Sequence, residues 1–399
     1  MKTKVAFLRG PNLNDAELVS YLPLLEDYEF SFYCNARSPL PIHTPQVSPR
    51  TLWYADDIVR SLPRHLQPAA ELLGQKFFGN LQTPLSIAEI CQTHQILHTA
   101  ETSNGYTHKA LALKERYPHK VVVTVWENNP FQHENNLTRP IGQKIGAGKL
   151  LVRKYADYFL VPAEASRTAL ELEGVPLERI ACIGAAVDLE RFQPRPKSGT
   201  VHRQLGISPQ ARVIVFAGRL VWEKGVFDLL EAFALLNRTA DPLEDVHLLY
   251  FGSGRERQNL EHERDLLSLR GHVHFMSGQA YANSDQMPAL FNDVDVLVLP
   301  SLPTRYWQEQ FGMVLIEAMA SGVPVIGSTS GAIPEVIGDG GVTFPAHDIR
   351  ALAHHLNELL RLPAYHRELA TRGRQHVERA YSPQAVSARI RRVYEKVHG

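Results

Sequence analysis

Short apolar runs that alternate with helix-like segments constrain the fold of this chain most strongly. Strands buried on both faces of a parallel sheet are nearly continuous apolar runs, and parallel neighbours need a crossover connection, usually a helix. The alternation therefore predicts α/β domains with parallel sheets. The expected strands lie near residues 4–8, 30–33, 96–99, 121–125 and 158–161 in the first half, and near 213–217, 246–251, 273–276, 296–299 and 324–326 in the second.

The length requires more than one hydrophobic core. A single core usually stops growing at about 250–300 residues, whereas this chain has 399 residues, 44% of them hydrophobic. We therefore expect two domains. The stretch 192–202, with Pro194, Pro196 and Gly199, is the expected linker because proline and glycine punctuate regular structure.

Charge and cysteine content exclude several classes of protein. Lys+Arg and Asp+Glu are both 42, so no overall basic field attracts nucleic acid. The sequence contains no run of 18 apolar residues, so no transmembrane segment is predicted. Residues 1–8 are better explained as a first strand than as a signal peptide. The cysteines, at 34, 91 and 182, lack metal-ligand spacing, so we expect a reduced, cytoplasmic protein without a metal site.

Two glutamates bracket the start of a predicted helix in the second half. Residues 296–299 form a strand-like run, and a helix is expected from Phe311 to Gly322, with Glu309 in the loop before it and Glu317 about two turns in. The unpaired N–H groups of a helix start bind anions such as phosphate. Carboxylates accept hydrogen bonds from hydroxyls. A nucleotide sugar supplies both: diphosphate for the helix, sugar hydroxyls for Glu309 and ribose hydroxyls for Glu317.

Cations that suit the diphosphate lie upstream. The run 213–216 predicts a buried strand, a helix is expected over 226–236, and the loop between them carries Arg219 and Lys224. Ligands bind parallel sheets at such strand-to-helix loops. Arginine grips a phosphate with two hydrogen bonds, and lysine adds a mobile point charge.

These motifs, in this order and spacing, resemble the donor-binding half of family 4 retaining glycosyltransferases (glycosyltransferase group 1), which have the GT-B fold. The resemblance is dense over residues 155–341. It rests on Gly-Arg at 218–219 with Lys-Gly at 224–225, the two glutamates at 309 and 317, and the segments 174–176, 187–194, 300–301, 318–325 and 331–335.

The resemblance implies an α/β GT-B protein whose two Rossmann-like domains face each other across a cleft. The acceptor would bind to residues 1–192, joined by a crossing helix at 382–399, and the donor to residues 193–381. The donor is a UDP- or GDP-sugar, which is a substrate, so no cofactor is expected. The implied donor-binding residues are Arg219, Lys224, Glu309, Phe311, Gly312, Met313, Val314 and Glu317, with Gly252 and Gly254 either contacting the nucleotide or serving only as a turn.

The family resemblance also implies a reaction that retains the anomeric configuration. Asp293 and Asp295 directly precede a buried strand and are poorly placed to hold a metal. We therefore expect Arg219, Lys224 and the helix dipole to stabilise the leaving diphosphate instead. The candidate catalytic residues are Glu309, Arg219, Lys224 and Glu101.

The first half departs from the family pattern at its histidines. Ala100 stands where relatives have the second of two histidines, and Trp126 where they often have another. Glu101, Glu127 and Asn128 are the candidate replacements, whereas His98 is expected to pack. The candidate acceptor-binding residues are Gly10, Asn12, Trp126, Glu127 and Asn128.

The acceptor and the activity leave alternatives open. We expect a carbohydrate or glycan-like acceptor, or a lipid-linked one if an apolar patch lies beside the site, with peripheral contact at the inner face of a membrane. No long basic amphipathic helix commits the chain to a membrane. A non-catalytic or hydrolytic sugar-nucleotide-binding protein is the alternative function. A sugar phosphorylase fits less well, because it would bring a lysine-bound pyridoxal cofactor and a far longer chain. A nucleotide-sugar epimerase fits less well, because it lacks the paired-glutamate layout.

Overall fold

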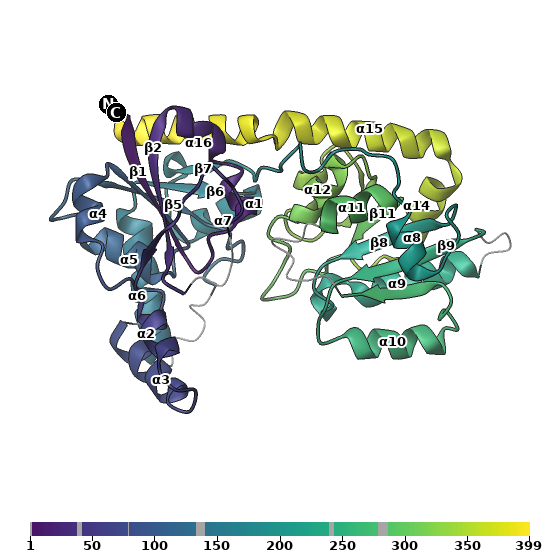
Figure 1. Ribbon diagram of the computed structural model, residues 1–399, viewed down its shortest axis with the longest axis horizontal. Coiled ribbons are helices and arrows are strands. Elements are labelled where there is room, and N and C mark those ends of the chain that lie inside the picture. Colours follow the sequence, from purple (N-terminus) through teal and green to yellow (C-terminus); the bar gives the residue numbers. More distant parts are fainter. Residues whose placement is uncertain (1, 38–41, 79, 133–139, 239–242, 278–285) are drawn as a thin grey trace. The chain divides into compact units, whose positions relative to one another are not determined.

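The computed structural model describes residues 2–37, 42–78, 80–132, 140–238, 243–277 and 286–399. The chain divides into two compact units (Figure 1). The first comprises Met1–Ala186 together with Pro383–Gly399, and the second comprises Val187–Ser382. The division therefore falls at residues 186–187, whereas the sequence placed it at 192–193.

The first unit is built on a seven-stranded sheet in the order β3-β2-β1-β4-β5-β6-β7. Every pairing is parallel. The strands are β1 (Thr3–Gly10), β2 (Tyr28–Asn35), β3 (Arg50–Leu52), β4 (Ile96–Ala100), β5 (Lys120–Thr124), β6 (Tyr158–Val161) and β7 (Ile180–Cys182).

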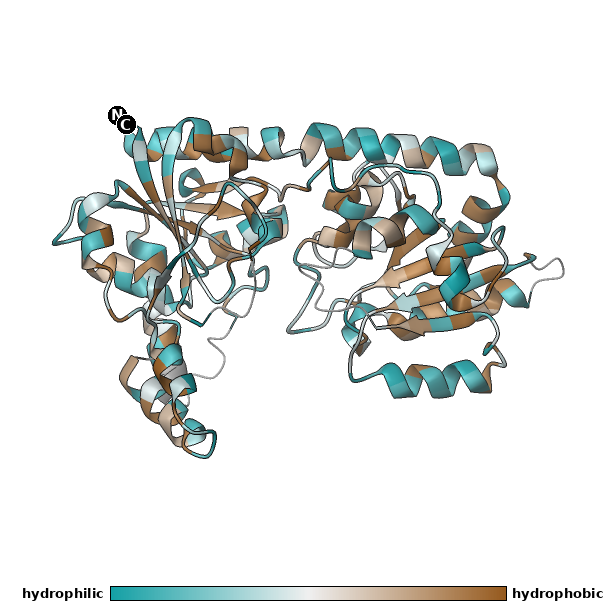
Figure 2. Cartoon of the chain, viewed as in Figure 1, coloured by the Kyte–Doolittle hydropathy of each residue, from teal (hydrophilic) through white to brown (hydrophobic). Residues whose placement is uncertain are grey.

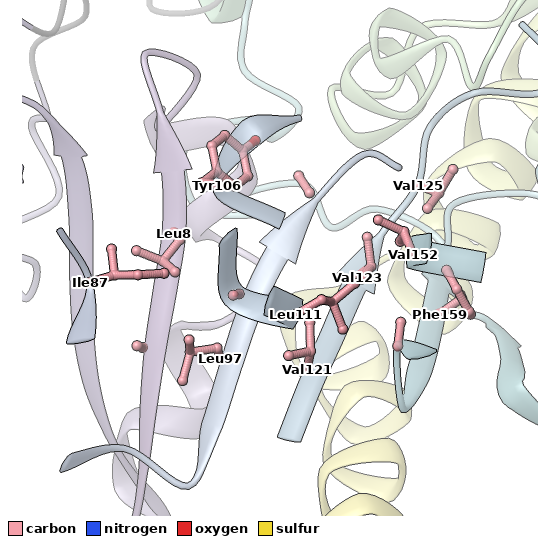
Figure 3. Packing of buried hydrophobic residues seen from close by; sticks show 14 of the residues in the cluster. Leu8, Ile87, Leu97, Tyr106, Leu111, Val121, Val123, Val125, Val152 and Phe159 are labelled. Carbon is pink, nitrogen blue, oxygen red and sulfur yellow. The ribbon is translucent and has the colours of Figure 1, made fainter. Parts of the chain in front are cut away.

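Alternate residues of these strands enter two cores, one on each face of the sheet. Along β1, Ala6 and Leu8 belong to one core, and Val5 and Phe7 belong to the other. Successive side chains of a strand point to opposite faces, so an uninterrupted apolar run is what a sheet covered on both sides requires. Figure 3 shows side chains of the first core, among them Leu8 and Leu97 from two neighbouring strands, with Ile87 beside Leu8.

The second unit has a six-stranded parallel sheet in the order β10-β9-β8-β11-β12-β13. The strands are hydrophobic along most of their length (Figure 2). Their bounds are β8 (Arg212–Ala217), β9 (Val246–Phe251), β10 (Val273–Met276), β11 (Val296–Leu299), β12 (Val325–Ser328) and β13 (Val342–Phe344).

Helices connect the strands in both units. In the first unit they are α1 (Asp15–Leu18), α2 (Ala55–Ser61), α3 (Gln67–Phe78), α4 (Ala88–Thr93), α5 (Gly105–Ala112), α6 (Pro140–Tyr155), α7 (Glu164–Leu172) and α16 (Pro383–His398), with 3-10 turns η1 (Leu22–Glu26) and η2 (Leu177–Arg179). In the second they are α8 (Thr200–Leu205), η3 (Trp222–Lys224), α9 (Val226–Asn237), α10 (Arg257–Leu266), α11 (Gln286–Asp293), α12 (Met313–Ala320), α13 (Ile333–Ile337), α14 (Ile349–Arg361) and α15 (Pro363–Ala380). None of these described helices is long and apolar enough to cross a bilayer.

The last helix belongs to the first unit although it is far from it in sequence. Val386, Ile390 and Val393 of α16 are buried in the core that contains β1. The hydroxyl of Tyr394 is 2.5 Å from Nδ1 of His98 on β4. Helix α16 thus completes one face of the first sheet.

Each sheet reverses its strand order at one point, and this position fixes where a ligand can bind. The reversal lies between β1 and β4 in the first unit and between β8 and β11 in the second. The loops that follow these two strands diverge to opposite faces and leave a crevice beyond their carboxyl ends, where open α/β sheets bind ligands.

All ten strands expected from the sequence are present, with small differences at their ends. The three that were missed, β3, β7 and β13, have three residues each and lie at sheet edges. An edge strand has a single neighbour and needs no long apolar run, so its sequence signal is weak. The helix expected from Phe311 begins at Met313, because Gly312 has a φ of +88° that a helix does not allow.

Candidate functional site

Lys224 and Glu309 join the two loops at the reversal point of the second sheet. Nζ of Lys224 lies 2.6 Å from Oε2 of Glu309, and the hydroxyl of Ser301 donates to the same oxygen at 2.6 Å. The two charged side chains are 14% and 8% exposed. Poorly hydrated charges form strong, short hydrogen bonds, so this pair fixes the loop after β8 against the loop after β11.

The loop after β11 is ordered by its own hydrogen bonds. Oγ1 of Thr304 accepts from the backbone N–H groups of Tyr306 and Trp307. This turn sets the indole of Trp307 with its ring centre 5.0 Å from Nζ of Lys224, within the range of a cation–π contact. Tyr306 is 65% exposed. Trp307 therefore orients the lysine, while Tyr306 remains available to a ligand.

Two glycines let the backbone come close enough to form this pair. A Cβ on Gly225, whose φ is +67°, would lie 1.9 Å from the carbonyl oxygen of Pro300. A Cβ on Gly331, whose φ is +55°, would lie 2.1 Å from that of Glu309. Neither contact is physically possible for another residue, so glycine at these positions is a requirement of the site's backbone.

Helix α12 presents its N-terminus beside this pair. Its N-cap is Gly312, which has no side chain to accept hydrogen bonds from the first turn. The start of the helix is fixed by packing, because Phe311 is buried and its ring meets that of Tyr381 edge-on at 5.5 Å. Val314 is also buried and Met313 is partly exposed. An uncapped helix start of this kind suits an anion.

Glu317 lies one turn into α12, closer to the helix start than the sequence suggested. Its Oε2 is buried and has no hydrogen-bond partner among the described residues. Burial raises the pKa of this carboxyl to about 7, and the positive charge of Arg191 opposes the shift. A buried carboxylate oxygen without a donor is costly, and hydroxyl groups of a ligand would satisfy it.

Arg219 is the exposed cation of the site. Its side chain forms no hydrogen bond or ion pair with any residue that the structure describes, whereas its backbone neighbours are held closely. The N–H of Leu220 donates to the carbonyl of Ser253 at 2.8 Å. A Cβ on Gly252 or Gly254 would lie about 2 Å from a carbonyl of this loop, at 1.9 Å and 2.1 Å respectively. The two glycines thus have a structural role in supporting the loop of Arg219.

The reversal point of the first sheet is polar and tightly packed. Gly10 ends β1 with a φ of +56°, and a Cβ there would lie 3.2 Å from Oδ1 of Asn35 and 3.3 Å from the ring of Tyr106. Oδ1 of Asn35 is buried and receives no hydrogen bond from the described residues. Beneath it, the buried Arg9 bonds to Glu17 at 2.7 Å and to the carbonyl of His98 at 3.2 Å.

Glu101 follows β4 at the same reversal point, in a strained conformation. Its φ is +58°, uncommon for a residue other than glycine and found mainly where surrounding structure enforces it. Oε1 accepts from the N–H of Trp126 at 3.0 Å, and Oε2 is buried with no hydrogen-bond partner among the described residues. Burial, reinforced by the charge of Glu127, raises its pKa to about 8.

Glu101 lies beside a buried network of charged groups. Lys149 bonds to Glu127 at 2.8 Å and lies 3.8 Å from Glu173, which Arg153 contacts at 2.9 Å. The charge of Glu127 adds to the effect of burial and favours the protonated form of Glu101 near neutral pH.

The other residues predicted for the first domain have different environments. His98 is fully buried between Tyr394 and Thr124 and packs, as expected. Asn128 is buried and Trp126 is partly exposed, while Asn12 is exposed. Gly10 thus ends β1, Asn12 lies on the loop after it, and Trp126 and Asn128 lie on the loop after β5. Glu127 forms an ion pair with Lys149.

Three further residues complete these sites: Ser301 belongs to the motif at 300–301, Trp307 was expected from the sequence either to line the donor sugar or to pack, and only Lys149 was not singled out. Ser301 and Trp307 complete the environment of Lys224 and Glu309, and Lys149 neutralises Glu127. Ser301 ends an apolar run just before a candidate site, which is a usable signal. Lys149 lies within a helix and had no such signal in the sequence, because its partner Glu127 lies in a different segment of the chain.

Residues 198–376 match the family of glycosyl transferases group 1. Among curated proteins, the chain is 27% identical over 294 residues to a D-inositol 3-phosphate glycosyltransferase of Streptomyces bingchenggensis, covering 72% of this chain and 63% of that protein. It is 32% identical over 253 residues to an MMP alpha-(1->4)-mannosyltransferase of Mycolicibacterium hassiacum, covering 62% and 56%. The matches thus span about three fifths of the length of these relatives.

Solved structures share the fold over nearly the whole chain. A sucrose-phosphate synthase of Thermosynechococcus elongatus superimposes with a TM-score of 0.69 at 18% identity, covering 99% of each chain. Anabaena HepE in complex with UDP gives 0.69 at 17% identity, covering 99% of this chain and 100% of that one. At this identity the likeness establishes the fold, and it confirms the predicted fold class of two parallel-sheet units.

We predict that Glu101→Gln stabilises the protein at alkaline pH. The folded state keeps the Glu101 proton up to a pKa of about 8, whereas the unfolded chain loses it near 4.5. The unfolded state therefore binds fewer protons between these values, and wild-type stability falls as pH rises through that window, by at most about 1.4 kcal/mol per pH unit. Glutamine removes this slope.

Urea unfolding from pH 5 to 9 measures the effect. The stability difference between Glu101→Gln and wild type should widen up to about pH 8 and then level off. Glu89→Gln, at an exposed position of α4, is the matched control and should follow the wild-type profile. A constant difference at every pH would contradict the assigned titration.

Proposed function

The second unit of this chain belongs to the family of glycosyl transferases group 1, and from this premise we propose that the protein transfers a sugar from a nucleoside diphosphate to an acceptor hydroxyl. The observation that carries the proposal is the 2.6 Å contact of Lys224 with Glu309 at the reversal point of the sheet. A lysine that suits phosphate and a carboxylate that suits sugar hydroxyls thus lie together, beside the uncapped start of α12, and this supports the proposal.

Each part of the donor has a matching group. The diphosphate lies at the start of α12, where Arg219 and Lys224 supply positive charge. Glu309 accepts hydrogen bonds from the transferred sugar, and Glu317 accepts them from the ribose. In the free protein Lys224 is bound to Glu309, so the arriving phosphate shares this lysine and leaves Glu309 free to accept from hydroxyls. The nucleoside is uridine or guanosine.

The proposed reaction retains the anomeric configuration and uses no metal. The bond between the anomeric carbon and the phosphate oxygen breaks, and the acceptor oxygen bonds to the same carbon from the same face. The acceptor proton passes to the departing phosphate. Arg219, Lys224 and the dipole of α12 stabilise the negative charge that develops on the diphosphate. Asp293 serves instead as a cap, since its carboxylate accepts from the N–H groups of Ser198 and Val201.

The acceptor is proposed to bind to the first unit, at the loops that carry Gly10, Glu101 and Trp126. Oδ1 of Asn35, which ends β2 beside Gly10, and Oε2 of Glu101 are buried with no hydrogen-bond partner among the described residues, and they suit hydroxyl groups. The alternative function is a sugar-nucleotide-binding protein that hydrolyses its ligand or has no activity. The absence of a histidine at Ala100 favours that alternative.

Thermal-shift titration with a panel of nucleotide sugars tests the proposal. A true donor at 100 times its Kd adds about 2.7 kcal/mol of stability, before and after exhaustive chelation with EDTA. Transfer to a sugar acceptor, followed by mass spectrometry, separates a transferase from a binding protein. If no member of a broad panel shifts the melting temperature, or if transfer requires an added divalent metal, the corresponding part of the proposal is wrong.

Removal of either cation should slow the reaction. A charge-assisted hydrogen bond contributes about 1.5–3 kcal/mol, and about 1.4 kcal/mol corresponds to a tenfold rate change. Arg219→Ala and Lys224→Ala should each lower kcat/KM about 10–100-fold. Because Lys224 also neutralises the buried Glu309, only its variant should lose stability. Arg367→Ala, at an exposed position of α15, is the control, and wild-type kinetics in Arg219→Ala would refute its role.

The two glutamates should have separable effects. Glu309→Gln should lower kcat, because this residue contacts the transferred sugar, and Glu317→Gln should raise the donor KM. Since ribose hydroxyls favour the ionised form of Glu317, whose pKa is raised to about 7, the wild-type donor KM should fall as pH rises through 7. Glu317→Gln should lack that pH dependence. An unchanged pH profile in this variant, or the opposite kinetic pattern, would overturn the assignment.

A further inference from the structure

A polar pocket lies in the first unit beside the loop that follows β1. It has a volume of about 320 Å³, at the lower end of the roughly 300–1,000 Å³ that small-molecule pockets have. Five of its eight lining residues are polar, namely Asp56 and Arg60 of α2, Gln75 of α3, and Asn80 and Gln82 in the segment after that helix. The function proposed above uses none of these five residues.

One wall of the pocket is ordered by its own hydrogen bonds. The N–H of Gln82 donates to Oδ1 of Asn80 at 2.7 Å, and the hydroxyl of Thr83 donates to the carbonyl of Asn80 at 2.6 Å. The N–H of Asp56 donates to the carbonyl of Leu81 at 3.0 Å and attaches this wall to the start of α2. The wall is therefore preorganised in the free protein, which lowers the cost of binding a ligand.

The pocket adjoins the reversal point of the first sheet. Pro11, which lines it, directly follows Gly10 at the end of β1. Nδ2 of Asn80, another lining residue, donates to the carbonyl of Ser103 at 2.8 Å. Ser103 lies two residues after Glu101, on the loop that follows β4. The pocket therefore borders both loops of the reversal point to which the acceptor is proposed to bind.

The charges in the pocket cancel each other. Nε of Arg60 lies 2.6 Å from Oδ2 of Asp56, one helical turn away. Among the described residues, no other charged side chain lines the pocket. An anionic ligand would meet the carboxylate together with the guanidinium, so the pocket favours a neutral ligand over a phosphate or a carboxylate.

Carboxamides give the pocket its chemical preference. The side chains of Gln75, Asn80 and Gln82 each carry an oxygen that accepts hydrogen bonds and an amino group that donates them. Sugar hydroxyls also donate and accept, so they match these groups. The amide of Asn80 is bonded at both its oxygen and its nitrogen, which leaves the two glutamines for a ligand.

Gln82 carries the clearest sign of a missing partner. Its Oε1 is buried with no hydrogen-bond partner in the described part of the chain. Leaving a buried acceptor without a hydrogen bond costs free energy. A hydroxyl group that enters the pocket would supply the bond.

We propose that this pocket is a second acceptor subsite, which binds one unit of a neutral oligosaccharide while the neighbouring unit receives the transferred sugar at the reversal point. Gln75 and Gln82 bond to hydroxyl groups of the bound unit. Its ring carbons contact the apolar lining, which is formed by Pro11, Leu81 and Ile145. The role of the oligosaccharide as acceptor rests on the proposed transferase function, whereas the binding of a neutral sugar stands on the pocket alone.

NMR titration without a nucleotide sugar tests the pocket. The probes are the disaccharides maltose, cellobiose, lactose and mannobiose, and the methyl glycosides of glucose, galactose and mannose. At least one disaccharide should bind to wild type about tenfold or more tightly than any methyl glycoside, because its second ring adds hydrogen bonds in the pocket.

Two variants remove the glutamine amides one at a time. Gln82→Met and Gln75→Met keep the length of the side chain but remove its donor and acceptor, so each should weaken disaccharide binding about 2–10-fold. Gln92→Met, at an exposed position of α4, is the matched control and should bind as wild type does. Without sugar, Gln82→Met should melt at or above the wild-type temperature, because it loses an unpaired buried oxygen. Weaker binding without loss of stability distinguishes a ligand contact from a structural role.

The subsite is overturned if no disaccharide binds, or if none binds more tightly than the methyl glycosides. It is also overturned if Gln75→Met and Gln82→Met both bind the disaccharide as wild type does, or if Gln92→Met loses as much binding as they do. A melting temperature of Gln82→Met well below that of wild type would assign this residue to the fold, and Gln75→Met then decides the proposal alone.

Transfer assays separate this result from the proposed function. With a donor identified by thermal shift, kcat/KM should be higher for the disaccharide than for the methyl glycoside, and Gln82→Met should reduce that ratio. Transfer with equal kcat/KM for both acceptors would reject the subsite and leave the transferase proposal in place. Disaccharide binding that depends on Gln75 and Gln82, without any transfer, would reject the transferase and leave a sugar-binding pocket.

Discussion

The parallel pairing of β8 with β11 is the constraint on which the candidate donor site depends. Val296 aligns with Ile214 and Leu297 with Val215, so the loops that follow these strands emerge side by side at the point where strand order reverses. Lys224 and Glu309 are far apart in sequence and meet there at 2.6 Å. Ligand binding at such points is general for open α/β sheets, because helices leave to opposite faces and the crevice between them stays open.

Close backbone approach is the second requirement of this site. Gly225 and Gly331 occupy positions where a Cβ would overlap a carbonyl oxygen, and Gly252 and Gly254 do the same for the loop that carries Arg219. The function proposed for the charged residues therefore depends on glycines that allow their loops to approach each other closely.

The carboxyl groups of the two candidate sites have contrasting surroundings. Glu309 has a lysine and a serine hydroxyl as partners, whereas Glu317 and Glu101 each keep one buried oxygen that has no hydrogen-bond partner in the described part of the chain. Burial raises the pKa of Glu317 to about 7 and that of Glu101 to about 8. Carboxyls of this kind cluster at functional sites, because binding hydroxyl groups compensates for the cost that the free protein bears.

The sequence by itself determined the fold class, ten of the strands and the motif residues of the second unit. Buried parallel strands must be apolar throughout, and the motifs lie in loops directly after such strands, so local sequence carries both signals. Short edge strands, with one neighbour each, carried too little signal to be found. The start of α12 was misplaced by two residues, because the conformation of Gly312 is set by packing around Phe311 and Tyr381.

Only the tertiary structure decided which charges meet. It paired Lys224 with Glu309 and committed Glu127 to Lys149, and it left the leucines and phenylalanines of α3 exposed. The periodicity of a helix indicates which residues share a face, yet it does not indicate whether another element covers that face. Electrostatic partners and solvent exposure depend on segments distant in sequence, and folding alone brings those segments together.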